Sequence, residues 1–224
     1  RRLMPHAYYP MFADLTGRRC VIVGGGVVAQ RKVTTLLRYG ADLLVVSPTV
    51  TSRLQRYARQ GKIRHVARRF RQGDLRGAWL IYAATNDEPI NEQVYRAASR
   101  RRIFTNVVDQ KPLCSFIAPA IMKRGDLVVA ISTGGASPTM AKQLRRQCEH
   151  AIGSDYVHML KLLRSLRSLA KRRLPSYQDR KRYFDRLVLG RTFELVRRNR
   201  LEAAKREAIG LLERLSRHNG HGTR

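Results

Sequence analysis

A glycine-rich turn near the N-terminus constrains the fold more than any other feature of this chain. Residues 19–23 form a short apolar run, and Gly24-Gly25-Gly26-Val27-Val28-Ala29 follows it directly. Residues 27–39 then carry apolar side chains at helical spacing until Gly40. A strand, a G-x-G-x-x-A turn and a helix in this order are typical of a dinucleotide-binding βαβ unit.

The residues of this turn have distinct physical tasks. Gly24 permits a tight turn, Gly26 lets the backbone approach a pyrophosphate, and Ala29 is small enough for the helix to pack on the strand. The free N–H groups at the start of the helix favour an anion. A glycine turn without a ligand is the alternative, but its place in an alternating chain favours nucleotide binding.

Apolar strands and helices alternate through the first half of the chain. We expect further strands at 43–47, 63–66, 78–84 and 103–108, and helices at 51–59 and 90–101. Continuous apolar strands separated by helices indicate a parallel sheet that is covered on both faces. The predicted fold class is therefore α/β, with a Rossmann-type parallel sheet.

The rhythm changes after Asp109. Residues 115–122 and 127–133 read as two strands of a hairpin, and a helix is expected at 138–151. From Tyr156 onward only helical patterning is visible. The second half therefore predicts a hairpin and a helix followed by an all-helical C-terminal region.

The net charge limits the classes of partner. The chain has 45 Lys and Arg against 16 Asp and Glu, a formal charge of +29, and the bases are spread over both halves. This balance favours nucleic acid, an acidic membrane face or a polyanionic small molecule. The alternative is an arginine-biased surface whose bases are mostly solvated.

Several classes of protein are not favoured. The longest uncharged stretch, 127–141, is too short to span a membrane, and no signal peptide is visible. The three cysteines form no C-x-x-C pair, and no two histidines have the spacing of a helical metal site. We expect no dedicated metal site and a reducing, cytoplasmic compartment.

Candidate site residues follow the predicted strands. Ser47, Pro48 and Thr49 end the second strand, where many NAD sites have an acid, so this position leaves NAD and NADP open. Asp109 follows the fifth strand at the ligand edge, where it suits proton transfer or, alternatively, caps a loop. Residues 133–135 precede a helix that Ser137 caps, and they form either a second anion site or a flexible turn.

Four segments in order resemble a known family. Residues 20–29, 106–109, 112–116 and 130–138 are similar to precorrin-2 dehydrogenase, the NAD-dependent dehydrogenase module of siroheme synthase. The resemblance implies oxidation of precorrin-2 to sirohydrochlorin with NAD as hydride acceptor. Some members also insert ferrous iron to give siroheme, and the sequence leaves this open.

The resemblance also implies a domain organisation and an assembly. We expect an NAD-binding Rossmann domain at 1–112, a dimerisation region with a hairpin and a helix at 113–152, and a basic helical domain at 153–224. The expected partners are the tetrapyrrole substrate and a second copy of the chain, with no specific nucleic acid and no membrane.

The expected site residues fall into three groups. Asp109 is the expected catalytic residue. The expected cofactor contacts are Gly24, Gly25, Gly26, Val27, Val28, Ser47, Pro48, Thr49 and Thr85. The expected substrate contacts are Asn106, Thr133, Gly134 and Ser137. Arginine suits the rim carboxylates of precorrin-2, which accounts for part of the positive charge.

Two other functions fit some of these features. A nucleotide-sensing regulator that binds nucleic acid would use the Rossmann core and the basic helices, although no helix-turn-helix is visible. A Rossmann oxidoreductase acting on another anionic substrate is the other alternative.

Overall fold

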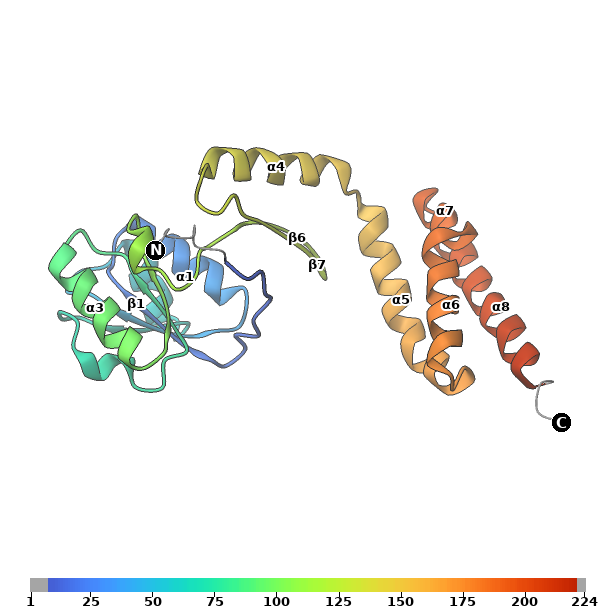
Figure 1. The fold of residues 1–224 in the computed structure, drawn as a ribbon, viewed down its shortest axis with the longest axis horizontal. Helices are drawn as coiled ribbons and strands as arrows, with labels where there is room; N and C mark the ends of the chain where they lie inside the picture. The colour runs from blue at the N-terminus through green and yellow to red at the C-terminus, as the bar shows by residue number, and fades with distance from the viewer. Residues whose placement is uncertain (1–7, 221–224) are drawn as a thin grey trace, which may run out of the picture. The chain divides into compact units, whose positions relative to one another are not determined.

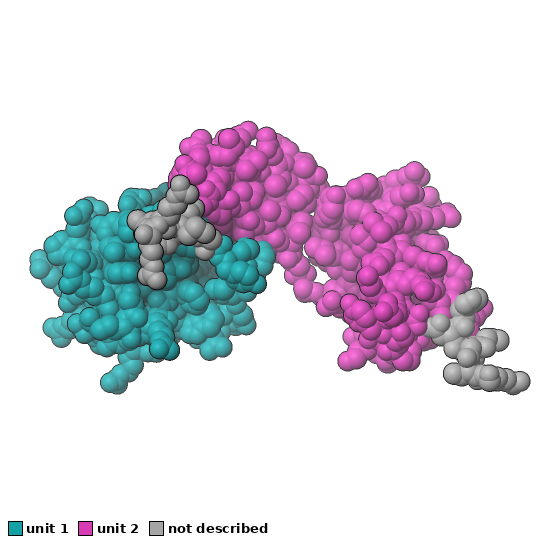
Figure 2. Space-filling model, viewed as in Figure 1, with its two compact units in different colours: residues 1–118 teal, residues 119–224 magenta. Residues whose placement is uncertain are grey.

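The structure is a computed structural model that describes residues 8–220. The chain divides into two compact units, Arg1–Ala118 and Pro119–Arg224, which are coloured separately in Figure 2. No helix among the described residues has the length and apolar character needed to cross a bilayer.

The first unit is built on a parallel sheet of five strands (Figure 1). Its strands are β1 (Arg19–Val23), β2 (Asp42–Val46), β3 (Arg64–Val66), β4 (Leu80–Ala83) and β5 (Phe104–Val107). They lie in the order β3-β2-β1-β4-β5, and every neighbouring pair is parallel. The predicted Rossmann-type sheet is therefore confirmed.

Helices cover both faces of this sheet because successive strand residues alternate between two apolar clusters. One cluster joins Cys20 and Ile22 to helices α1 (Val27–Leu37) and α2 (Ser52–Arg59). The opposite cluster joins Val21 and Val23 to α3 (Glu88–Arg100) and the short helix η1 (Gln72–Leu75). This alternation follows from the two-residue period of a strand.

The segment after β5 differs from the sequence prediction. A short helix, η2 (Lys111–Leu113), comes first, and β6 (Ala120–Arg124) begins later than the predicted strand at 115–122. Ser115 donates its backbone N–H to the carbonyl of Thr105 at 2.8 Å, which ties this stretch to the first unit. The division into units accordingly lies after Ala118.

The second unit begins with the expected hairpin and helix. Strands β6 and β7 (Leu127–Ile131) pair antiparallel, and Gly125 turns between them with a φ of 57°. Helix α4 (Pro138–Ala151) packs on the hairpin, and Arg124 donates to the carbonyl of Glu149 at 2.8 Å. This hydrogen bond holds the end of the helix against β6.

The rest of the second unit is helical, as the pattern predicts. Its helices are α5 (Ser154–Arg173), α6 (Tyr177–Leu189), α7 (Arg191–Arg197) and α8 (Leu201–Gly220). They share an apolar cluster of their own, in which Tyr183 is fully buried. The Tyr183 hydroxyl donates to the carbonyl of Ala208 at 3.0 Å and so links α6 to α8.

Candidate active site

Four strand ends place the predicted site residues of the first unit along one edge. Because β2, β1, β4 and β5 are adjacent and parallel, the segments that follow them emerge on the same side of the sheet. The glycine turn follows β1, Thr85 follows β4, and Asp109 follows β5. The structure therefore brings together residues that the sequence predicted separately.

The first two glycines of the turn are held tightly between neighbouring strand ends. Gly24 donates its N–H to the carbonyl of Val46 at 3.0 Å and has a φ of 118°. A Cβ on Gly24 would lie 2.2 Å from the carbonyl oxygen of Ala84, and one on Gly25 would lie 1.9 Å from that of Thr49. Any side chain at either position would collide with the backbone, so close approach requires glycine here.

Gly26 is different because the space beside it is open. A Cβ built on Gly26 would meet no atom within 4 Å, and its φ of −78° suits any residue. Gly26 is the N-cap of α1, and no side chain caps this helix. The helix N–H groups and the open side of Gly26 fit the pyrophosphate of a dinucleotide.

The segment after β2 forms one wall of this turn. Ser47 is buried, and its carbonyl lies 2.9 Å from Nε2 of His65 on β3. Its hydroxyl oxygen lies against the turn, and a Cβ on Gly25 would be 2.9 Å from it. Pro48 and Thr49 are exposed at the same edge. Ser47 therefore supports the turn, while its two successors face outward.

Thr85 holds the start of α3. Its hydroxyl lies 2.8 Å from Oδ1 of Asn91, and the Asn91 amide donates to the Thr85 carbonyl at 3.0 Å. The hydroxyl also accepts the backbone N–H of Asp87 at 3.1 Å. These bonds fix the shape of the loop that closes β4.

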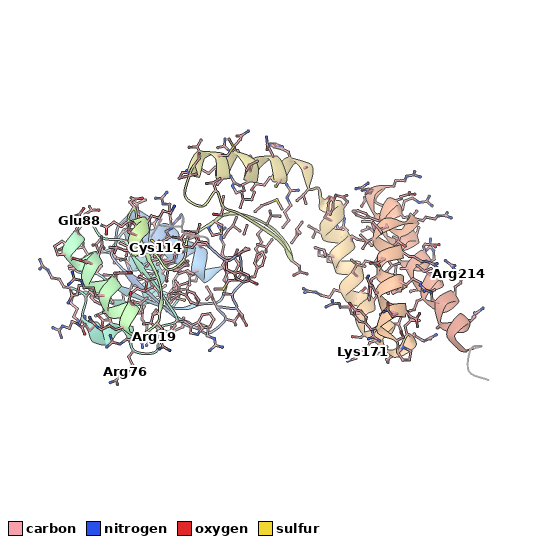
Figure 3. All side chains as sticks on the ribbon, in the orientation of Figure 1. Arg19, Arg76, Glu88, Cys114, Lys171 and Arg214 are labelled. Atoms are coloured by element: carbon pink, nitrogen blue, oxygen red, sulfur yellow. The ribbon has the colours of Figure 1, made fainter. Side chains whose placement is uncertain are left out.

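Asp109 presents an exposed carboxylate in a constrained turn. Its φ is 61°, a left-handed conformation that aspartate tolerates better than most residues. Within the described part of the chain, the carboxylate makes no hydrogen bond or ion pair. Cys114, labelled in Figure 3, ties the turn to β5, because its thiol donates to the carbonyl of Val107 at 3.2 Å. The carboxylate is therefore available to a ligand.

Asn106 faces into the protein. It is 8% exposed, and its amide donates to the carbonyl of Phe116 at 3.0 Å. This bond anchors the stretch after η2 to β5. One N–H of the amide is thus used within the fold, and the expected contact of Asn106 with substrate stays a prediction.

The remaining expected substrate contacts belong to the second unit and form one compact turn. The Thr133 hydroxyl accepts the backbone N–H of Ser137 at 3.0 Å, and the Ser137 hydroxyl accepts that of Met140 at 3.1 Å. Gly134 has a φ of 62°, and its N–H donates to the Ser132 hydroxyl at 3.1 Å. The predicted N-cap at Ser137 is confirmed, whereas the substrate role of this turn stays a prediction.

One charged residue at the sheet edge is absent from the sequence predictions. The ammonium of Lys32 on α1 lies 4.9 Å from the ring centroid of Tyr82 on β4, and the side chain is half-buried. Burial lowers the pKa of Lys32, and Arg31 lowers it further, while Asp109 and Cys114 oppose this shift. The sequence does contain a signal that could have identified Lys32. It lies four residues after Val28, a spacing that places both side chains on one face of a helix.

Three sequence-family models match the chain in succession. A model described as putative NAD(P)-binding covers residues 11–120, one described as the sirohaem biosynthesis protein central region covers 124–150, and one described as the sirohaem synthase dimerisation region covers 155–213. The chain belongs to the precorrin-2 dehydrogenase and siroheme synthase family.

The chain is similar in sequence to curated siroheme synthases. It is 38% identical to siroheme synthase 1 of Yersinia enterocolitica over 95% of its own length and 45% of that protein. It is 36% identical to the siroheme synthase of Mannheimia succiniciproducens over 89% of its length and 42% of that protein. The chain thus spans less than half the length of these relatives.

A solved structure shares the fold of this family member. SirC, a precorrin-2 dehydrogenase, superposes with a TM-score of 0.75 at 26% identity and covers 92% of this chain and 100% of SirC. The first unit is accordingly the NAD-binding domain, and the turn at Gly26 suits that cofactor. Nothing in these matches favours a nucleic-acid-binding regulator.

The dimerisation model matches the helices of the second unit. Its range, 155–213, lies within the segment for which we expected a basic helical domain. The dimerisation region was expected at 113–152, and residues 124–150 of that segment match the central-region model instead. Among residues 8–220, no group of three or more His, Cys, Asp or Glu side chains is arranged to hold a metal ion.

Proposed function

We propose that this chain oxidises precorrin-2 to sirohydrochlorin with NAD. The observation that carries the proposal is the exposed carboxylate of Asp109 on the same sheet edge as the open turn at Gly26. The name of SirC and those of the siroheme synthases support the choice of substrate.

The residues divide the chemistry between them. Oxidation removes a hydride and a proton from precorrin-2. NAD, when bound, supplies the acceptor for the hydride. Asp109 accepts the proton, for which its exposed carboxylate is suited. The glycine turn and the start of α1 would hold the cofactor phosphates, so that the hydride acceptor and the base would lie at the same edge of the sheet.

Replacing the carboxylate of Asp109 by an amide tests its role as the base. We expect Asp109→Asn to lower kcat for NADH formation by at least a hundredfold, because general-base catalysis typically contributes about 10²–10⁴-fold. NAD affinity should change less than twofold. Asparagine also tolerates the left-handed backbone, so the fold is preserved. The assay follows NADH formation and the tetrapyrrole spectrum with precorrin-2, and an Asp109→Asn enzyme of normal turnover would contradict the proposed role.

Iron insertion is a second activity that needs an incubation of its own. Ferrous iron would enter as substrate and be held mainly by the macrocycle, and Asp109 would accept the pyrrole protons that it displaces. Adding ferrous iron to purified sirohydrochlorin and the protein, and comparing the absorbance change with a protein-free control, decides this point. An equal change in both would remove chelation from the proposal.

We further propose that the chain works as a homodimer in a reducing cytoplasm. The match of residues 155–213 to a dimerisation region supports pairing. The three cysteines are free thiols, which fits a reducing compartment. Light scattering on the purified chain should give twice its 25.7 kDa mass; the mass of a single chain would contradict the dimer.

A further inference from the structure

Lys32 lies near the proposed site but has no role in the proposed reaction. It lies one helical turn after Val28, an expected cofactor contact, on the same face of α1. Gln30, two residues earlier, faces another way, since its side-chain oxygen accepts the hydroxyl of Thr51 beside α2 at 2.7 Å. The helix therefore directs Lys32 away from α2 and toward β4.

Tyr82 provides the surface on which the ammonium rests. Its ring lies 4.9 Å from Nζ of Lys32 and packs edge-on against Phe116, with 5.3 Å between the ring centroids. Tyr82 is also the register partner of Asn106 in β5, whose amide holds Phe116. The ammonium of Lys32 thus lies over a tyrosine ring that packs on Phe116, and Phe116 is tied to the strand leading to Asp109.

The electrostatic surroundings agree with this placement. The carboxylate of Asp109 and the thiol of Cys114 both lie close enough to Lys32 to raise its pKa, against the larger lowering by burial. Lys32 also lowers the otherwise raised pKa of Cys114. The cation and the predicted base therefore belong to one edge of the same unit.

No carboxylate of the first unit pairs with this cation. The ion pairs found there among the described residues join arginines to acids, at 2.6 to 2.8 Å, and none includes Lys32. A half-buried ammonium that has lost part of its hydration without forming an ion pair is costly. A carboxylate that binds the ammonium would offset that cost. The Tyr82 ring holds the ammonium in place for such a contact.

We propose that Lys32 binds a carboxylate of the tetrapyrrole and thereby positions the macrocycle against Asp109. The inference rests on the proposed function for the identity of the substrate. Lys32 contacts substrate in this arrangement and takes no part in proton transfer. Its contribution is expected in binding of the ring more than in the chemical step.

The chain contains a matched control for this residue. Lys62 also lies over a tyrosine, with its ammonium 5.8 Å from the ring centroid of Tyr57. Lys62 is exposed and stands just before β3, at the amino edge of the sheet, opposite the ligand edge. Removing its charge changes the same kind of cation–aromatic pair without touching the proposed site.

The test compares Lys32→Gln, Lys32→Met, Lys32→Arg and Lys62→Gln with the unaltered protein. Equilibrium titration with sirohydrochlorin measures tetrapyrrole binding without turnover, NAD binding is titrated separately, and kcat and KM are measured with precorrin-2. We expect Lys32→Gln and Lys32→Met to weaken tetrapyrrole binding and raise KM about tenfold, the loss typical of one charged hydrogen bond. Lys32→Arg should restore most of the binding, and Lys62→Gln should behave as the unaltered protein.

Two results would overturn the proposal. One is unchanged sirohydrochlorin binding in both neutral variants. The other is an equal loss of NAD and tetrapyrrole affinity, which would assign Lys32 to the cofactor phosphates. Lys32→Met keeps an unbranched stem on Tyr82, so it reports on the charge even if Lys32→Gln folds poorly. If the unaltered protein formed no NADH from precorrin-2, the proposed function would fail, while the titration would still decide the role of Lys32.

Discussion

At the scale of single residues, two adjacent glycines are required for different reasons. Gly25 is enclosed, and a Cβ there would lie 1.9 Å from the carbonyl oxygen of Thr49. Gly26 has open space around the same position. The fold therefore needs Gly25, whereas only a bound dinucleotide needs Gly26. One sequence motif thus combines a packing requirement with a binding requirement.

This distinction predicts the effect of Gly26→Ala. We expect NAD affinity to fall at least tenfold, because the methyl group occupies the space through which the pyrophosphate approaches the backbone. The melting temperature without NAD should stay within about 2 °C, since alanine adopts the observed φ without strain and meets no neighbour. Calorimetric titration and thermal unfolding measure the two quantities.

Gly25→Ala serves as the contrasting variant. It should lower the melting temperature of the cofactor-free protein through its collision with Thr49. If Gly26→Ala kept full affinity for NAD, the pyrophosphate would not lie against this residue.

At the scale of elements, a partly buried ion pair anchors the short helix η1. Both oxygens of Asp74 accept from the guanidinium of Arg68, at 2.6 and 2.9 Å, and one also accepts the backbone N–H of Arg71 at 2.8 Å. Burial raises the pKa of Asp74, but these hydrogen bonds and the charge of Arg68 outweigh it and leave the pKa below its usual value. Asp74 is therefore bound as a carboxylate.

The ion pair predicts a pH-dependent contribution to stability. A carboxyl group with a depressed pKa in the folded state stabilises fully above its unfolded pKa of about 3.9, and this stability is lost as pH falls through the folded value. We expect Asp74→Asn to cost about 2 kcal/mol at pH 7, and the difference from the unaltered protein to shrink below about pH 4. Thermal unfolding from pH 7 to pH 3 checks this.

An exposed ion pair provides the control for Asp74. Glu92 and Arg96 lie 2.6 Å apart on the surface of α3. Glu92→Gln should change stability by less than about 0.5 kcal/mol, since exposed pairs of this kind contribute little. A constant effect of Asp74→Asn down to pH 3 would show that the carboxylate charge is not what stabilises η1.

At the scale of the whole molecule, the two units have separate hydrophobic cores. The sheet of the first unit is covered by two apolar clusters, and the helices of the second share a third. Interactions within one core therefore have little direct effect on the other. Variants in different units should act independently on stability.

Tyr183→Phe tests this independence. Removing the hydroxyl leaves the buried carbonyl of Ala208 without its donor, at a cost of about 1 kcal/mol. We expect calorimetry to resolve two transitions, with Tyr183→Phe lowering one and Asp74→Asn the other. Tyr177→Phe, at an exposed position of α6, should change neither. A single transition shifted by both variants would mean that the units unfold together.

The agreement between sequence and structure follows the range of the interactions involved. Strand and helix periodicity, the glycine turn and the Ser137 cap depend on neighbouring residues, and the structure has all of them. The start of β6 was misplaced because Ser115 and Phe116, which look strand-like, pair instead with Thr105. The hydrogen bond from the Asn106 amide to the Phe116 carbonyl joins residues ten positions apart, and no local pattern predicts it.

The sequence by itself determined the parallel α/β core, the dinucleotide turn and the family, because periodicity and motif spacing are written in consecutive residues. Only the tertiary structure decided that Lys32 rests on Tyr82 beside the turn of Asp109, and that Gly25 is enclosed while Gly26 is open. These facts depend on how strands distant in the chain align at one sheet edge, and the packing of side chains from different elements sets that alignment.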